Sequence, residues 1–268
     1  MKRTLTIAMI ITLGFGMLAS ARDEGEGSAA ELAKKLANPI ASLISVPFQN
    51  NMDIGIGDNQ GSRSTLNIQP VIPISITEDL NLIAKVILPV ISQQNVIDIG
   101  TSVRGPGDSV ISAFLSPAST KSGIIWGAGP VILAPIATND LLTSRKFGIG
   151  PTAVALYQSR GMTFGALVNQ IWSVAGDAAR PDISTFFLQP FFTYNWKTGA
   201  GIGGNFELTQ NWNAGTTTLW LNPLLSAVTA MGKQKVQFAM GPRINLAAPE
   251  GTRAKFGVRA VNILLFPK

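Results

Sequence analysis

The stretch that decides the fold is residues 46–56, which read Val46-Pro47-Phe48-Gln49-Asn50-Asn51-Met52-Asp53-Ile54-Gly55-Ile56. Apolar and polar side chains alternate here, and a period of two predicts a β-strand with one apolar and one polar face. A strand of a membrane barrel has this pattern because one face contacts lipid and the other faces the lumen. The apolar face carries Val46, Phe48, Met52, Ile54 and Ile56, whereas Gln49, Asn51 and Asp53 share the other face.

Similar segments follow along the rest of the chain. We predict about 12 strands, an even number, as in bacterial outer-membrane barrels. Each approaches or exceeds the roughly 9 to 11 residues that a tilted strand needs to cross the hydrocarbon layer. The predicted strands span residues 46–56, 64–76, 80–91, 108–117, 123–136, 147–158, 162–173, 185–196, 200–210, 218–230, 234–247 and 254–266.

The connections between these strands alternate between short and long. Turns around residues 77–79 and 159–161 are tight, whereas the links at 92–107, 137–146 and 174–184 are longer. A barrel whose strands run up and down produces short periplasmic turns and long outer loops. The sequence therefore predicts an all-β protein, an antiparallel transmembrane β-barrel over residues 46–268 in the bacterial outer membrane.

The N-terminus has the features of a secretory signal. Lys2 and Arg3 precede an apolar run over residues 5–18, and Ala19-Ser20-Ala21 resembles a cleavage site. We predict a signal peptide over residues 1–21. The alternative is a retained anchor, although the apolar run is shorter than the roughly 20 residues of a spanning helix.

Residues 22–45 differ from the barrel in composition, and we expect a flexible segment followed by a short helix. Apolar residues spaced three and four apart predict the helix over residues 29–37. Ser28 and Glu31 have the spacing of a capping box, and Asn38-Pro39 is expected to end the helix. The helix either packs at the rim of the barrel or in the periplasm, or it inserts into the barrel mouth as a plug.

The composition excludes several functions. The chain has no Cys and no His, so it has neither disulfides nor a Cys/His zinc site, and no histidine can act as a catalytic base. We predict that it is not an enzyme and binds no cofactor or metal. The formal net charge of +6 is spread without basic runs, so no binding of nucleic acid is expected.

Aromatic residues and prolines mark particular places in the wall. Aromatic rings near strand ends are typical of the interfacial girdles of membrane proteins. Proline removes a donor from the sheet, so we interpret Gly129-Pro130, Gly150-Pro151 and Gly241-Pro242 as bends or bulges. The expected girdle residues are Trp126, Tyr157, Trp172, Tyr194, Trp196, Trp212 and Trp220.

The face that is expected to point inward carries the candidate functional side chains. They either line a path for a small solute, with the excess of positive charge favouring anions, or form a hydrogen-bonded filling of the lumen. Phe187 and Phe191 either stack on an apolar or aromatic solute or pack against other side chains of the protein. The candidates are Gln49, Asn51, Asp53, Gln69, Lys85, Asn169, Phe187, Gln189, Phe191, Asn205, Glu207, Arg243 and Arg259.

Several motifs occur in the order found in one bacterial family. They are Leu36–Pro39, Leu43–Gln49, Trp126–Pro130, Gly148–Pro151 and Gly165–Ser173. With them, most of residues 32–268 resembles the outer-membrane barrels labelled as transporters of the meta-pathway of phenol degradation. The resemblance implies an outer-membrane barrel, and the family's label suggests that aromatic compounds are transported.

Three functions remain open at this stage. The first is a channel or transporter that passes small solutes passively, hydrophobic or aromatic ones included. The second is a structural or interaction barrel with a filled, non-conducting interior, and the third is a soluble periplasmic β-protein. The expected partners are outer-membrane lipid, a small-molecule solute and the barrel assembly machinery, although Phe266 is followed by Pro267 and Lys268 where that machinery usually reads a terminal aromatic residue.

Overall fold

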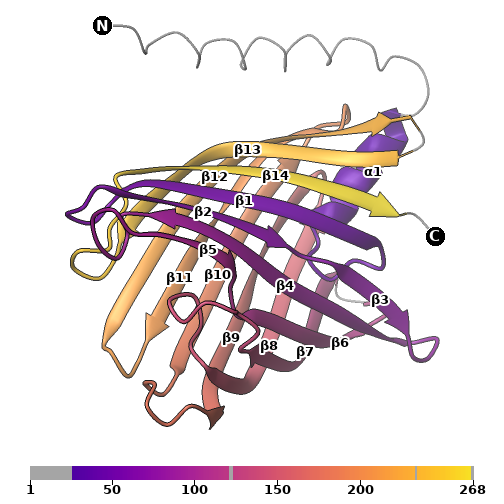
Figure 1. Ribbon diagram of the computed structural model, residues 1–268. Helices are drawn as coiled ribbons and strands as arrows, with labels where there is room; N and C mark the ends of the chain where they lie inside the picture. The colour runs from indigo at the N-terminus through magenta and orange to yellow at the C-terminus, as the bar shows by residue number, and fades with distance from the viewer. Residues whose placement is uncertain (1–25, 121–122, 233, 267–268) are drawn as a thin grey trace, which may run out of the picture.

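The alternating segments form one antiparallel sheet that curls round and closes on itself (Figure 1). The structure is a computed structural model, and it describes residues 26–120, 123–232 and 234–266. The signal peptide predicted over residues 1–21 lies outside this range. Closure is direct, because β1 (Ile44–Ile56) pairs with β14 (Phe256–Phe266) from Ile44↔Phe266 to Ile54↔Phe256.

Between these two strands, each crossing of the barrel wall pairs with the crossings before and after it in the chain. The connecting strands are β2 (Gly61–Ile68), β3 (Val71–Ser75), β4 (Leu80–Gln94), β5 (Ser102–Pro106), β6 (Ser109–Pro117), β7 (Ile124–Ala134), β8 (Lys146–Ser159), β9 (Met162–Gly176), β10 (Ser184–Asn195), β11 (Ala200–Asn211), β12 (Thr216–Met231) and β13 (Gln234–Ala247).

Two of the crossings are interrupted strands. β2 and β3 are separated by Gln69 and Pro70, and both pair with β4. β5 and β6 are separated by Gly107 and Asp108, and both also pair with β4. The 14 segments therefore form 12 crossings in the described chain. The predicted antiparallel barrel of about 12 strands with a short helix is confirmed.

The prediction missed one part of the wall. The link at residues 92–107 was expected to be a loop, but β4 continues to Gln94 and β5 pairs with this extension from Val90↔Pro106 to Gln94↔Ser102. Gly105, Pro106 and Gly107 hide the strand in the sequence, because glycine and proline normally mark turns. The other strands differ from their predicted bounds by no more than a few residues.

The Gly-Pro pairs do not form bulges. The pairing on either side of Gly129-Pro130 keeps one register, as it does around Gly150-Pro151 and Gly241-Pro242. Each glycine instead lies so close to the next strand that a Cβ atom would collide with a carbonyl oxygen there. Glycine is needed at these points because the neighbouring backbone occupies the space of a side chain.

The outer surface of the barrel is apolar. On β1, Met52 and Ile54 are exposed, whereas Asn51 and Asp53 are buried, so the predicted division of the two faces is correct as far as Ile54. Ile56 was expected on the same apolar face but is buried, because the register shifts between Ile54 and Ile56. Aromatic residues lie at both ends of this surface, with Trp126 and Trp196 near the short turns and Trp172 near the long loops. Trp220 differs from the prediction, because it lies inside the lumen over the guanidinium group of Arg243.

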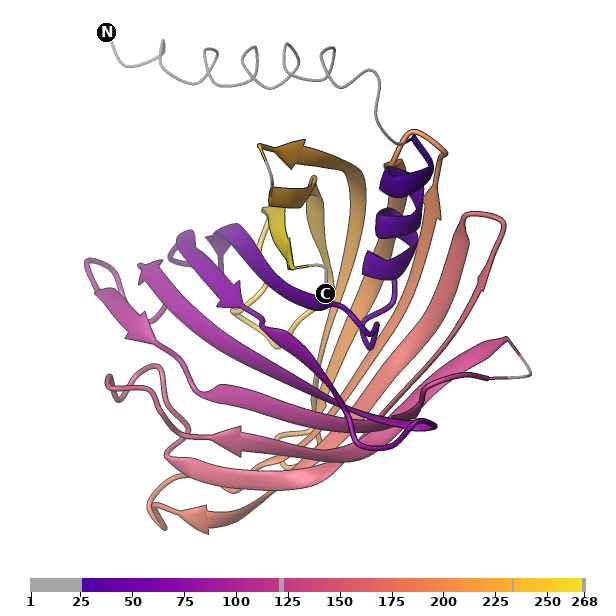
Figure 2. The same cartoon turned by 90° about the vertical axis from the view of Figure 1, so that its right-hand side faces the viewer.

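Helix α1 (Glu26–Leu36) lies along the inner side of the barrel wall at the end with the short turns (Figure 2). It contacts β10, β11 and β12. The helix already includes Ser28, so the predicted capping box at Ser28 and Glu31 is wrong as a helix start. Its end is as expected, since Asn38 closes the last turn and accepts a hydrogen bond from the Ile40 amide at 3.0 Å. In the described residues, no helix is long and apolar enough to cross a membrane.

Candidate functional site

The lumen has an apolar side and a polar side. On the apolar side, Ile40 from the segment after α1 packs against buried side chains of β3, β4, β6, β8 and β9, and Phe187 and Phe191 of β10 pack against the same cluster. Because these side chains fill their part of the lumen by close packing, the open volume lies outside this cluster. The cluster consists of Ile40, Val71, Ile83, Phe114, Val154, Leu156 and Leu167.

The polar side is crossed by a layer of ion pairs. The Arg243 Nε atom donates to Asp53 Oδ1 at 2.9 Å, and its Nη1 atom donates to Glu207 Oε2 at 2.9 Å. Arg259 contacts both oxygens of Glu207 at 2.9 Å. The side chain of Arg259 is 1% exposed and that of Glu207 is 15% exposed, so both charges are held away from bulk water. Two arginines therefore balance two carboxylates inside the barrel.

Asparagine amides complete this layer. Asn51 accepts a hydrogen bond from Arg259 Nε at 2.7 Å, and Asn222 accepts one from Arg243 at 3.1 Å. Asn222 also donates to Asn205 at 2.9 Å. These bonds satisfy donors that the carboxylates leave free, which lowers the cost of burying the charges. We call this layer the septum, and it consists of Asn51, Asp53, Asn205, Glu207, Asn222, Arg243 and Arg259.

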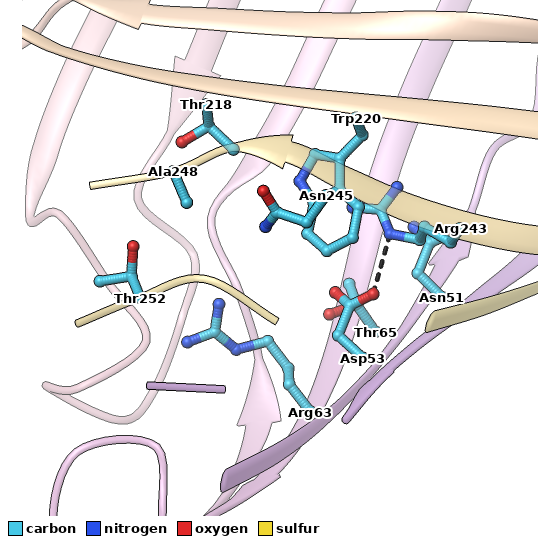
Figure 3. Close-up of a pocket in the computed structure, with 10 residues that line it drawn as sticks. All are labelled: Asn51, Asp53, Arg63, Thr65, Thr218, Trp220, Arg243, Asn245, Ala248 and Thr252. Carbon is cyan, nitrogen blue, oxygen red and sulfur yellow. Dashed lines mark hydrogen bonds and ion pairs between the residues drawn. The ribbon is translucent and has the colours of Figure 1, made fainter. Parts of the chain in front are cut away.

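A cavity lies on each side of the septum. The outer cavity, near the long loops, has a volume of about 240 Å³ (Figure 3). The inner cavity, near the short turns and α1, has a volume of about 260 Å³. The inward-facing residues of β12 pass from one cavity to the other. Thr218 and Trp220 line the outer cavity, and Asn222 belongs to the septum. Leu224 and Ser226 then line the inner cavity.

Each cavity contains a cation outside the septum. Arg63 lines the outer cavity, and its Nε atom donates to Gln93 Oε1 at 2.8 Å. Lys85 lines the inner cavity. Among the described residues, neither forms an ion pair with a carboxylate. Both cavities are therefore electropositive, whereas the septum between them is neutral.

The long loops carry a separate set of exposed ion pairs. Arg145 contacts Asp140 and Asp177, and its hydrogen bond lowers the pKa of the Asp140 carboxyl below its ordinary value. The backbone N–H of Ala179 and then Arg145 lower the pKa of Asp177 in the same way. These contacts join the loop at residues 135–145 to the loop at residues 177–183 above the barrel wall.

The structure brings most of the candidate residues together around one path. Asn51, Asp53, Asn205, Glu207, Arg243 and Arg259 form the septum, and Gln189 donates to Glu207 at 3.2 Å. Phe187 and Phe191 pack in the apolar cluster, and Asn169 lines neither cavity. The candidates that line the inner cavity are Gln49, Gln69, Lys85, Gln189 and Asn205.

Sequence reasoning missed four residues that matter here. Asn222 and Asn245 have the inward parity of their strands, so that parity could have identified them. Arg63 lies one residue before the predicted start of its strand and was therefore never assigned to a face. Trp220 was assigned to the outer girdle from its residue type, although its parity places it with Asn222.

The closed sheet, the apolar outer face and the polar lumen define the chain as an outer-membrane β-barrel. No family model and no curated protein sequence matches it. Its fold is similar to that of an outer-membrane channel from Pseudomonas putida F1, with a TM-score of 0.66 at 15% identity over 85% of this chain and 97% of that chain.

Two other solved structures are more distant in shape. The trimer form of OmpT, an outer-membrane protein of Vibrio cholerae, has a TM-score of 0.38 at 9% identity, over 83% of this chain and 98% of that chain. Its variant without loop L8 has a TM-score of 0.40 at 10% identity, over 83% of this chain and 98% of that chain. At these identities the comparisons concern the fold alone.

Proposed function

We propose that this protein is a non-enzymatic outer-membrane channel that passes small solutes passively along the polar side of its lumen. The observation that carries the proposal is the alignment of two cavities on opposite sides of the septum. The similarity in fold to the channel of Pseudomonas putida F1 supports the same function. In this proposal the septum is the constriction, and passage requires its ion pairs to separate transiently.

The lining charges favour anions. Strand residues along the path carry four cations, Arg63, Lys85, Arg243 and Arg259, against the two carboxylates Asp53 and Glu207. Rings of positive side chains select anions in narrow pores, because an entering anion exchanges hydration for favourable contacts. The proposed solutes are therefore small anions, and hydrophobic or aromatic solutes remain a prediction that rests on the resemblance in sequence.

Helix α1 is proposed to narrow the inner mouth as a plug. Asn195 Nδ2 donates to the Ala33 carbonyl at 3.4 Å, and Gln158 Nε2 donates to the Lys34 carbonyl at 2.8 Å. Ala33 is completely buried by these walls. Leu36, Ala37 and the residues that follow line the inner cavity, so displacing the helix would widen this part of the path.

Planar-bilayer recording tests the proposal. The wild-type protein should conduct and should prefer chloride over potassium. Replacing Arg243 and Arg259 together by Gln leaves two cations against two carboxylates, so the preference for chloride should disappear. A folded wild-type protein that shows no conductance in bilayers and no solute uptake in liposomes would contradict the channel.

A filled, non-conducting barrel is the second candidate, and the septum itself is the observation in its favour. Arg259 is completely buried, and each arginine of the septum has at least three side-chain partners. In a filled barrel the same double substitution would lower stability without changing conductance, because there would be no current to alter. Measuring conductance and stability of the same double variant therefore distinguishes a channel from a filled barrel.

A further inference from the structure

The outer cavity contains polar groups that the barrel itself leaves without partners. Asn245 is 7% exposed and lines the cavity, and its Oδ1 atom has no hydrogen-bond donor within the described chain. An acceptor buried without a partner has lost its hydration without gaining a hydrogen bond, which is unfavourable in the empty cavity. Such a group favours a ligand that brings a hydroxyl group into the cavity.

Arg63 adds a charge that forms no ion pair within the described chain. Asp53 lies directly opposite Arg63 on the neighbouring strand, yet Asp53 pairs with Arg243 instead. Within the described residues the Nη atoms of Arg63 form no hydrogen bond or ion pair, and the side chain projects into the cavity in Figure 3. Because a guanidinium group offers two parallel N–H donors to a carboxylate, Arg63 favours a carboxylate ligand.

The rest of the lining is also suited to hydroxyl groups. Thr65 and Thr218 line the cavity from β2 and β12, and Thr252 lies at its edge. The side chains converge on one space, and Trp220 supplies the main apolar wall (Figure 3). The volume of about 240 Å³ lies below the roughly 300–1,000 Å³ of sites for drug-sized ligands, so the ligand must be small.

The loop between β13 and β14 gives this cavity a fixed outer wall. It carries Ala248 and Thr252, which line the cavity. The Arg253 carbonyl accepts a hydrogen bond from the Gly57 amide at 3.1 Å, and the Lys255 amide donates to the Ile54 carbonyl at 3.0 Å. These bonds tie the loop to the end of β1, so the groups that face the ligand are already in position before binding.

We propose that the outer cavity binds a small hydroxylated monocarboxylate, of the size and chemistry of a sugar acid, before it reaches the septum. Arg63 holds the carboxylate, Asn245 Oδ1 accepts a hydrogen bond from a ligand hydroxyl, and the threonines contact the remaining hydroxyls. The inference rests on the proposed function, since the ligand is the solute that enters from the outer side. It adds a chemical class to that function.

Three probe molecules separate the contribution of the ligand carboxylate from that of the ligand hydroxyls. Gluconate has both a carboxylate and hydroxyls, sorbitol lacks the carboxylate, and hexanoate lacks the hydroxyls. Titrations followed by saturation-transfer NMR on the folded protein in nanodiscs should show gluconate binding at least tenfold more tightly than either analogue. Failure of gluconate to bind, or equal binding of all three probes, would overturn the inference.

Matched variants locate the site. Arg63→Gln should weaken gluconate at least tenfold and leave sorbitol unchanged, whereas Asn245→Leu should weaken gluconate and leave hexanoate unchanged. Arg104→Gln is the control, because Arg104 is exposed on β5 and lines neither cavity. Folding is checked by heat-modifiable mobility in gels, and Thr218→Val provides the test if Arg63→Gln does not fold. Gluconate binding that none of these variants weakens overturns the inference.

Conductance in potassium chloride, measured on the same preparations, distinguishes the two proposals. If the protein conducts but does not bind gluconate, the proposed binding site is wrong and the proposed channel function is supported. Gluconate binding that depends on Arg63, in a protein that does not conduct, supports the site and overturns the channel.

Discussion

The ion pair between Asp53 and Arg243 spans the strand that lies between them. Asp53 is on β1 and Arg243 is on β13, and both are register partners of Gly257 on β14. A Cβ atom at Gly257 would lie 2.8 Å from Asp53 Oδ1 and 3.0 Å from Arg243 Cβ. The pair therefore passes over a position where the chain has no side chain, and it links β1 to β13 across the last strand, β14.

Replacing this glycine should disturb the pair. In Gly257→Val the added side chain enters the space between the two charged groups, and overpacking of this kind costs about 1–3 kcal/mol. We expect a corresponding fall in the free energy of unfolding, measured by guanidinium titration of the protein in lipid vesicles. Ala260→Val is the matched control, because Ala260 is exposed on the same strand. Equal stability of the two variants would show that the space over Gly257 is not restricted.

Removing one partner of the buried pair should be more costly. Asp53→Ala leaves Arg243 with Glu207 as its remaining carboxylate, and breaking a buried ion pair costs about 3–5 kcal/mol. The same guanidinium titration measures the loss. Asp140→Ala removes a carboxylate from an exposed pair in the loops and should change stability little. Indistinguishable effects of the two substitutions would show that the buried ion pair contributes no more to stability than an exposed one.

The two faces of one strand should report different surroundings. Ile202 on β11 is 46% exposed, whereas Asn205 lines the inner cavity. Because the chain has no Cys, a single cysteine at either position can carry a fluorophore. Nitroxide-labelled lipid should quench the probe at residue 202 and leave the probe at residue 205 fluorescent. Quenching of both probes to the same extent would contradict the assigned faces.

Removing the helix should widen the inner mouth. We expect deletion of residues 22–37 to raise single-channel conductance, and Asn195→Ala to cause more frequent short openings because it removes one bond to α1. Glu31→Ala is a control, since within the described residues Glu31 pairs with Lys35 alone, on the exposed side of the same helix. Unchanged conductance after the deletion would place the constriction at the septum alone.

Lowering the pH should weaken the contacts between the outer loops. The pKa values of Asp140, Asp177 and Asp182 are lowered in the folded protein, the last mainly by its hydrogen bond from Lys146. A carboxyl with a lowered pKa stabilises the fold above the ordinary value of 3.8, and this contribution is lost as the pH falls through the folded value. The protection of residues 135–145 and 177–183 against hydrogen exchange, relative to the intrinsic rate at each pH, should therefore fall below about pH 4, and Asp177→Asn should show lower protection already at neutral pH.

The sequence predicted the wall of the barrel more completely than its interior. Period-two patterns depend only on neighbours in the chain, and they gave the strands of β1 and β13 and most of their two faces, with Ile56 after the register shift on β1 as an exception. They failed at β5, where Gly105, Pro106 and Gly107 resemble a turn. They were also ambiguous on β4, where Ile83 and Lys85 share the inner face because one faces the apolar cluster and the other faces the inner cavity.

The alternation of residues by itself determined a closed antiparallel barrel with an apolar outer surface, because the side of a strand on which each residue lies follows from its position in the chain. Only the tertiary structure decided which inward residues meet. Asp53 and Arg243 are separated by 190 positions, and their contact depends on the closure of β1 onto β14 and on the space left by Gly257. Closure and register are properties of the whole sheet, so no local pattern in the sequence could specify the septum or the two cavities beside it.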